Sequence, residues 1–124
     1  MKIKKKILIA EDELPLQKAI STKLKIEGFE VFVTGNGKEC LDLAFDKKPD
    51  LILLDINMPE MDGITALKEL KNNSKTRDIP VIMLTNYSES EKVSEVLSQG
   101  PCDYLIKSDW KLEDIVVKIK EKIN

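Results

Sequence analysis

The sequence predicts an α/β domain in which parallel strands alternate with helices. Short apolar runs of β-type residues alternate along the chain with segments whose apolar residues recur at helical spacing, and this happens five times. Three of the short runs are almost continuously apolar, which is typical of strands covered on both faces of a parallel sheet. A repeated strand–helix order produces right-handed crossovers, with helices on both faces of the sheet. The 124 residues fit one domain, residues 1–124.

Five apolar runs are short enough, and rich enough in β-branched or aromatic residues, to be strands. The predicted strands are Ile7–Ala10, Phe29–Val33, Leu51–Leu54, Val81–Leu84 and Tyr104–Ile106. The segments between them are long enough for helices, so each strand connects to the next through a crossover on one face of the sheet.

The helical segments show apolar residues every three or four positions. The first begins near Pro15, which suits an opening helical turn, and ends before Gly28. The second and third follow the turn residues Asn36–Gly37 and Asp62–Gly63. The apolar positions of the five predicted helices are Leu16, Ile20 and Leu24; Cys40, Leu41 and Ala44; Leu67 and Leu70; Val93, Val96 and Leu97; and Leu112, Ile115, Val116, Ile119 and Ile123.

Composition excludes several classes of function. Lysine and arginine total 20 and acidic residues total 22, a near-balance that argues against a general nucleic-acid binder and against a polybasic membrane patch. The absence of histidine excludes imidazole metal sites and histidine-based catalytic triads. Cys40 and Cys102 form no CxxC pair and are expected to pack as small hydrophobic residues in a reducing cytosol. Because the run Ile7–Ala10 is too short for a signal sequence or membrane span, a cytoplasmic location is expected.

Polar residues stand at the ends of four predicted strands. Glu11 and Asp12 follow the first strand, and Asp55, Thr85 and Lys107 follow the third, fourth and fifth. Open α/β sheets bind ligands outside the carboxyl ends of their strands. If the first strand is central, with the third, fourth and fifth beside it in turn, these groups converge on one edge. A carboxylate at a strand end can also cap a helix, and Asp12 could cap a helix beginning at Leu14.

These residue types suit phosphoryl transfer. Neighbouring carboxylates repel one another unless a cation joins them, and an all-oxygen site suits Mg²⁺. Asp55 is the natural nucleophile, since an aspartyl carboxylate can accept a phosphoryl group. The reaction requires in-line positioning and neutralised charge. These needs could be met by Mg²⁺ on Asp12 and Asp55, the Lys107 ammonium and the Thr85 hydroxyl. The chain itself needs no histidine for this reaction, because the phosphodonor can supply one.

The same residues lie in stretches that resemble the response-regulator receiver domains of two-component signalling. Each stretch is weak evidence alone, but together, in this order and at this spacing, they are specific and cover nearly the whole chain. The matching stretches are Ile7–Glu13, Asn36–Gly37, Pro49–Gly63, Ile79–Thr85 and Asp103–Lys107. The resemblance implies a flavodoxin-like, three-layer (βα)5 sandwich whose five-stranded parallel sheet has the order 2-1-3-4-5.

The resemblance also implies roles for individual residues. Asp55 would be the phosphoacceptor, and Lys107 would contact the phosphoryl group. Asp12 and Asp55 would bind Mg²⁺ directly, and Glu11 would bind it directly or through water. The backbone carbonyl of Asn57 would complete the protein ligands, while its side chain would lie beside the phosphate and influence the rate of hydrolysis.

Two further residues would carry the switch. The resemblance implies that Thr85 moves toward the phosphoryl group and that Tyr104 turns inward behind it. This would shift the face formed by the fourth helix, the fifth strand and the last helix, because the new charge biases an existing two-state element. Tyr104 is also compatible with a plain half-buried strand aromatic.

Several positions depart from the pattern of the family. Ser108 stands where the family usually has a proline after Lys107. In the family, the peptide bond before that proline is cis. Because a cis bond without proline costs about 3 kcal/mol, a trans Lys107–Ser108 bond is expected. Asn86 replaces a small residue after the strand-end threonine, and Tyr87 follows it. Both side chains could narrow access to Asp55 and slow the approach of a phosphodonor or water.

The leading hypothesis is a phosphoacceptor switch, not a turnover enzyme, that receives its phosphoryl group from a histidine kinase or phosphotransfer protein. Its output would be a protein contact or a fused domain. Direct binding to nucleic acid or membrane is not expected, and the chain would be a monomer or a phosphorylation-dependent dimer. One alternative is a receiver-fold interaction module that works without phosphorylation. A phosphohydrolase would need an acid where Asn57 stands, and a flavin site is disfavoured because the turn Glu11–Glu13 would repel phosphate.

Overall fold

The computed structural model describes residues 4–85, 103–107 and 111–123. Its strands form one sheet, parallel throughout, in the order β2-β1-β3-β4-β5, which confirms the predicted topology. The strands are β1 (Lys6–Ala10), β2 (Glu30–Thr34), β3 (Leu51–Asp55), β4 (Val81–Thr85) and β5 (Asp103–Ile106). The predicted bounds of each strand agree within one residue at either end.

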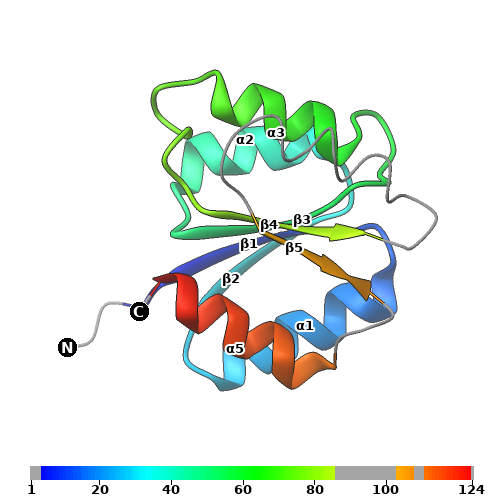
Figure 1. Ribbon diagram of the computed structural model, residues 1–124, viewed down its shortest axis with the longest axis vertical. Helices are drawn as coiled ribbons and strands as arrows, with labels where there is room; N and C mark the ends of the chain where they lie inside the picture. The colour runs from blue at the N-terminus through cyan, green and yellow to red at the C-terminus, as the bar shows by residue number, and fades with distance from the viewer. Residues whose placement is uncertain (1–3, 86–102, 108–110, 124) are drawn as a thin grey trace.

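Helices cover both faces of this sheet (Figure 1). The described helices are α1 (Leu14–Ile26), α2 (Gly37–Lys47), α3 (Gly63–Lys71) and α5 (Leu112–Ile123). α2 and α3 lie on one face and α1 and α5 on the other, so the predicted three-layer sandwich is confirmed. The helix predicted around Val93 and Leu97 lies outside the described residues.

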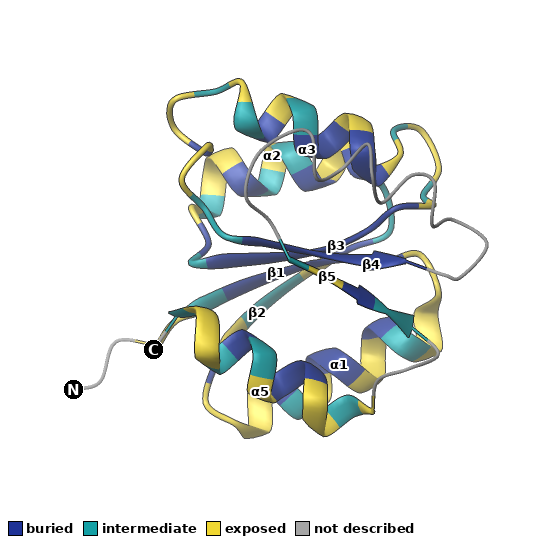
Figure 2. Cartoon of the chain, in the orientation of Figure 1, coloured by how far each residue is buried: buried dark blue, intermediate teal, exposed yellow. Residues whose placement is uncertain are grey.

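Alternate side chains of each central strand enter two separate cores. On one face, Leu8 and Leu54 pack with residues of α2 and α3. On the other, Ile9 and Leu53 pack with residues of α1 and α5. β1, β3 and β4 are buried almost throughout, as their continuous apolar runs predicted. Figure 2 shows the buried strands between helices whose outer sides are exposed.

The predicted turn residues begin two of the helices. The Asn36 side chain accepts a hydrogen bond from the backbone of Glu39 at the start of α2. The Asp62 side chain accepts one from the backbone of Thr65 at the start of α3. In α1 the N-cap residue is Glu13, whose side chain makes no capping bond. Helix capping therefore does not account for Asp12.

Cys40 confirms the packing role expected of it. Its side chain is free, fully buried, and part of the core beneath α2. Burial raises the pKa of the Cys40 thiol to about 12, so the thiol stays protonated at neutral pH. Cys102 lies outside the described residues.

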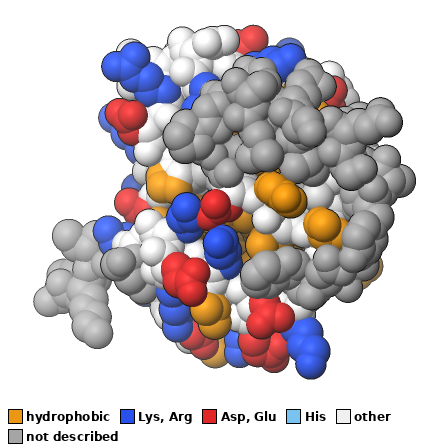
Figure 3. Space-filling model, in the orientation of Figure 1, with side chains coloured by type: hydrophobic (Ala, Val, Ile, Leu, Met, Phe, Trp, Pro, Cys, Tyr) orange, Lys and Arg blue, Asp and Glu red, His pale blue; other side chains and the backbone are white. Residues whose placement is uncertain are grey.

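Ion pairs fasten the last helix to its neighbours. Lys122 of α5 lies 2.6 Å and Lys118 lies 3.5 Å from Oδ2 of Asp103, at the start of β5. Lys120 pairs with Glu27, at the end of α1. Figure 3 shows acidic and basic side chains next to one another on this face of the molecule. Such partly exposed pairs each contribute at most about 1 kcal/mol, so apolar packing supplies most of the attachment of α5.

Gly63 brings the start of α3 against the end of β3. Its N–H donates to the carbonyl of Ile56 at 2.7 Å. A Cβ at this position would lie 2.0 Å from the backbone oxygen of Asp55. Only glycine therefore permits this approach, which fixes the backbone on both sides of the Asp55–Ile56 step.

We expect Gly63→Ala to lower the free energy of unfolding by about 1–3 kcal/mol, because the added methyl must displace backbone and not a flexible side chain. Gly35→Ala is the matched control, since the nearest heavy atom to its added Cβ would lie at an ordinary 3.8 Å. Urea unfolding of both variants measures the difference. Equal midpoints would show that α3 moves without cost and that Gly63 does not fix this part of the chain.

Candidate functional site

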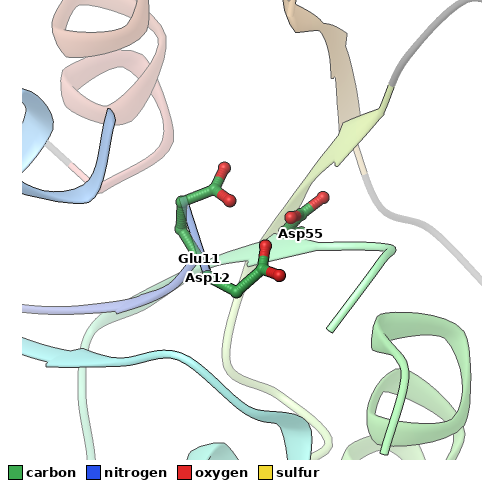
Figure 4. Close-up of side chains that lie close together, drawn as sticks. All are labelled: Glu11, Asp12 and Asp55. Atoms are coloured by element: carbon green, nitrogen blue, oxygen red, sulfur yellow. The ribbon is translucent and has the colours of Figure 1, made fainter. Parts of the chain in front are cut away.

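The site is built at the carboxyl ends of two adjacent strands. β1 and β3 are parallel neighbours with Ala10 opposite Leu54. Glu11 and Asp12 follow β1 directly, and Asp55 is the last residue of β3. Because the register places these ends side by side, ligand oxygens of the three carboxylates lie within 4.8 Å of one another (Figure 4). The convergence predicted from the sequence is observed.

The acidic cluster has a buried wall and an exposed side. Glu11 has no exposed surface and Asp55 is only 2% exposed, whereas Asp12 is exposed. Charged groups are rarely buried to this extent without a partner. Burial of Glu11 and Asp55 strengthens the electrostatic interactions within the site, and a solute can reach the cluster from the side of the exposed Asp12.

Lys107 supplies a positive charge to this cluster from the end of β5. Its Nζ lies 2.9 Å from Oε1 of Glu11 and 3.2 Å from Oδ2 of Asp55, and its side chain is 13% exposed. Nζ also lies 3.3 Å from Oε1 of Glu13. One ammonium is therefore shared among three carboxylates, while Asp12 adds a fourth nearby.

The charges in the site are incompletely balanced. Burial, followed by the adjacent Glu11, raises the pKa of Asp55 from 3.8 to about 8, although Lys107 opposes the shift. Burial alone would lower the pKa of Lys107, but Glu11 and Asp55 outweigh burial and raise it. Lys107 is therefore charged at neutral pH, and Asp55 holds a proton far more readily than an ordinary aspartate.

The residues present fit a small divalent cation. Oε1 of Glu11 is buried and makes no hydrogen bond, although Lys107 lies close enough for an ion pair. The cluster offers carboxylate oxygens only, which is the donor set that Mg²⁺ prefers. The excess of carboxylates over ammonium groups and the raised pKa of Asp55 both indicate a site that a cation would stabilise.

The backbone after Asp55 is held in place. The N–H of Ile56 donates to the carbonyl of Leu84 at 3.2 Å, and the carbonyl of Ile56 accepts from Gly63. The N–H of Asn57 makes a long contact of 3.4 Å with Oδ1 of Asp55, and Asn57 is exposed beside the acidic cluster. These bonds keep the chain beyond Asp55 at the edge of the sheet.

The two predicted switch residues differ in exposure. Thr85, at the end of β4, is 1% exposed, whereas Tyr104 on the edge strand β5 is 41% exposed. The strand register puts Thr85 opposite Ile106, one residue before Lys107. Thr85 is therefore close along the sheet to the lysine of the site. Asn86, Tyr87 and Ser108, and with it the Lys107–Ser108 bond, lie outside the described residues.

The contacts that two residues, Glu13 and Gln17, make beside the acidic cluster were not predicted from the sequence. Glu13 belongs to a stretch that resembles the receiver family, yet its contact with Lys107 was not foreseen. Gln17 is buried, and its side chain bonds the backbone of Glu11. The available signal was a polar residue among the buried positions of α1, between Leu16 and Ile20.

A sheet of this order, with a buried aspartate, acidic neighbours and a lysine at its carboxyl edge, defines an α/β domain of the receiver type. The family model of the response regulator receiver domain matches residues 7–120, and the chain belongs to this family. The resemblance found in the sequence is confirmed. Receiver domains bind Mg²⁺ at an acidic pocket and interact with histidine kinases and output domains.

Similar proteins agree with this assignment. The chain is 46% identical over 102 residues to the regulatory protein AtoC of Escherichia coli K12. This match covers 82% of this chain and 22% of AtoC. It resembles the chemotaxis protein CheY4 of Vibrio cholerae, with 28% identity, a TM-score of 0.87, and coverage of 97% of this chain and 99% of that one. It also resembles the receiver domain of the sensor histidine kinase PA1611 of Pseudomonas aeruginosa, with 27% identity, a TM-score of 0.87 and 98% of each chain covered.

The curated relatives are mostly longer proteins. The chain spans between 22% and 56% of their lengths. Their names describe regulators, which is consistent with a signalling switch. Within the described part of the chain, no helix combines the length and the apolar character needed to cross a bilayer.

We expect Asp55→Asn to stabilise the Mg²⁺-free protein. Because the folded-state pKa of Asp55 lies above its unfolded value, folding takes up a proton between about pH 4 and pH 8, and the free energy of unfolding falls as the pH rises through this window. The asparagine variant lacks this loss. Its advantage should therefore grow between pH 5 and pH 8 and reach about 1–3 kcal/mol in urea unfolding.

Asp46→Asn is the control for this comparison, since the Asp46 side chain is 71% exposed and lies in α2. It should show no comparable change with pH. Added Mg²⁺ should reduce the advantage of Asp55→Asn, because the cation stabilises the ionised carboxylates. An advantage that is the same at both pH values would contradict the raised pKa of Asp55.

Proposed function

We propose that this domain, residues 1–124, is a phosphorylation-dependent switch in which Asp55 accepts a phosphoryl group. One observation carries the proposal. A nearly buried aspartate lies among other carboxylates with an ammonium 3.2 Å from its oxygen, so a nucleophile and a positive charge meet at one point. A carboxylate nucleophile needs such neighbouring charge, because the transferred group and the attacking oxygen are both anionic.

Mg²⁺ would be held by Glu11, Asp12 and Asp55, with the backbone carbonyl of Asn57 as a further ligand. When bound, it neutralises charge on the phosphoryl oxygens. The similar receiver domain of PA1611 has been crystallised with a magnesium ion coordinated in its active-site cleft, which supports the same use of this cluster.

The chain's own residues perform the transfer. An oxygen of Asp55 attacks phosphorus as the bond to the leaving group breaks, and the leaving group departs with that electron pair. The Lys107 ammonium binds the oxygens of the phosphoryl group and offsets their charge. The Asn57 side chain would lie beside the phosphate and influence its rate of hydrolysis. Asn86 and Tyr87, which lie outside the described residues, would narrow access of the donor and of water to Asp55.

The switch then acts through the strand ends next to the site. Thr85 moves toward the phosphoryl group, and Tyr104, which is exposed in the described structure, turns inward. This changes the surface around β5 and α5 to which a partner binds. The phosphoryl group biases a pre-existing equilibrium by as much as its contacts differ between the two states.

The partners follow from this chemistry. The donor is a histidine kinase or a phosphotransfer protein, which brings the histidine that this chain lacks. The output is a downstream protein or a fused output domain, without direct contact to nucleic acid or membrane. The protein works in the cytoplasm, as a monomer or a phosphorylation-dependent dimer, and does not turn over a substrate as an enzyme.

Acetyl phosphate with Mg²⁺ tests the reaction directly. The wild type is expected to gain one phosphoryl group by intact-mass spectrometry, and chelation of Mg²⁺ should prevent the gain. Asp55→Asn should gain none, whereas the exposed control Asp46→Asn should behave as the wild type. An unmodified wild type would favour an interaction module that works without phosphorylation, and steady turnover of a phosphate ester would favour a phosphohydrolase.

Lys107→Met should change metal binding and phosphorylation in opposite directions. Without the ammonium, Glu11 and Asp55 have no competing cation, so Mg²⁺ is expected to bind more tightly in calorimetry. Phosphorylation by acetyl phosphate should slow by about tenfold or more at saturating Mg²⁺, because a charge that stabilises the transition state is lost. Phosphorylation at the wild-type rate would contradict the role proposed for Lys107.

A further inference from the structure

Gln17 is a buried polar residue in the second turn of α1. It is 8% exposed and lies on the side of the helix that packs on the sheet, with Ile20 and Leu24. A buried amide is costly unless its hydrogen-bonding groups are paired. The pairs that Gln17 makes therefore explain why a polar residue stands in this apolar face.

The Gln17 side chain joins two strand ends. Its Nε2 donates to the carbonyl of Glu11 at 2.8 Å and to the carbonyl of Thr34 at 3.0 Å. Both partners are acceptors, so the nitrogen end of the amide must face them. One side chain thereby ties α1 to the residue after β1 and to the last residue of β2.

These bonds fix the turn that carries the acidic residues. The N–H of Glu11 donates to the same Thr34 carbonyl at 3.0 Å, and the N–H of Glu13 donates to a side-chain oxygen of Glu11 at 3.1 Å. Gln17 thus holds the backbone of Glu11 from the helix side while β2 holds it from the sheet side. The direction in which Glu11 and Asp12 leave the backbone depends on this double attachment.

We propose that Gln17 is a positioning residue for the cation site, which aligns Glu11 and Asp12 with Asp55 without touching the cation. The inference rests on the function proposed above. Groups that orient metal ligands from behind commonly change metal affinity by about 10–100-fold when they are replaced. Gln17 acts through the main chain, so its removal is expected to loosen two ligands together.

Gln17→Met tests the proposal, because methionine keeps a similar length and lacks both donors. The Mg²⁺ dissociation constant is expected to rise by about tenfold in calorimetry at a temperature where the variant is folded. Thr76→Val is the matched control. Thr76 is also buried and also donates to a backbone carbonyl, that of Leu70 at 2.7 Å, but it lies in the loop before β4. It should lose stability and keep the wild-type affinity for Mg²⁺.

Gln17→Asn guards against a variant that fails to fold, since it keeps the amide and only shortens its reach. Its affinity for Mg²⁺ should be weaker than that of the wild type. Hydrogen exchange at the backbone of Asp12 and Glu13 should accelerate in both Gln17 variants more than exchange in β3, a local effect that general destabilisation does not produce.

The outcomes separate the two proposals. A wild type that neither binds Mg²⁺ nor accepts a phosphoryl group would overturn the proposed function. A wild type that does both, with a Gln17→Met variant that binds Mg²⁺ as tightly as Thr76→Val, would overturn the positioning role alone.

Discussion

The organisation of this domain depends on electrostatic repulsion that the fold itself creates. Two parallel strands end side by side, and the chain places carboxylates at both ends. Burial prevents water from screening them, and Lys107 can offset only part of their charge. The site is thus left with a need for further positive charge. A cation bound among these carboxylates would relieve their repulsion, and that relief would contribute to its binding.

The sequence predicted the fold well because local and global signals agree. The apolar runs of β1, β3 and β4 are buried on both faces. The turn residues Asn36 and Asp62 stand at the starts of α2 and α3, where the predicted helices begin. Strand-end carboxylates could be placed together because the order of the sheet determines which ends are neighbours. For the same reason the principal site residues Glu11, Asp12, Asp55 and Lys107 were foreseen, and their roles remain proposals.

What the sequence did not reveal depends on side-chain reach and close backbone approach. A contact such as Glu13 to Lys107 joins residues 94 positions apart, and only the packed structure decides which of several acids the lysine meets. The bonds of Gln17 likewise depend on the depth at which α1 packs. Glu60, in the loop between Asp55 and α3, has a left-handed φ of 66°. The sequence does not predict this backbone conformation, because residues other than glycine rarely adopt it.

The division of the interior into two cores has an evolutionary consequence. The residues that pack under α2 and α3 are entirely different from those that pack under α1 and α5, since alternate strand side chains serve opposite faces. One helical layer can accumulate substitutions while the other keeps its packing. Substitutions in one helical layer can therefore change its outer surface without disturbing the packing beneath the other layer or the acidic edge of the sheet.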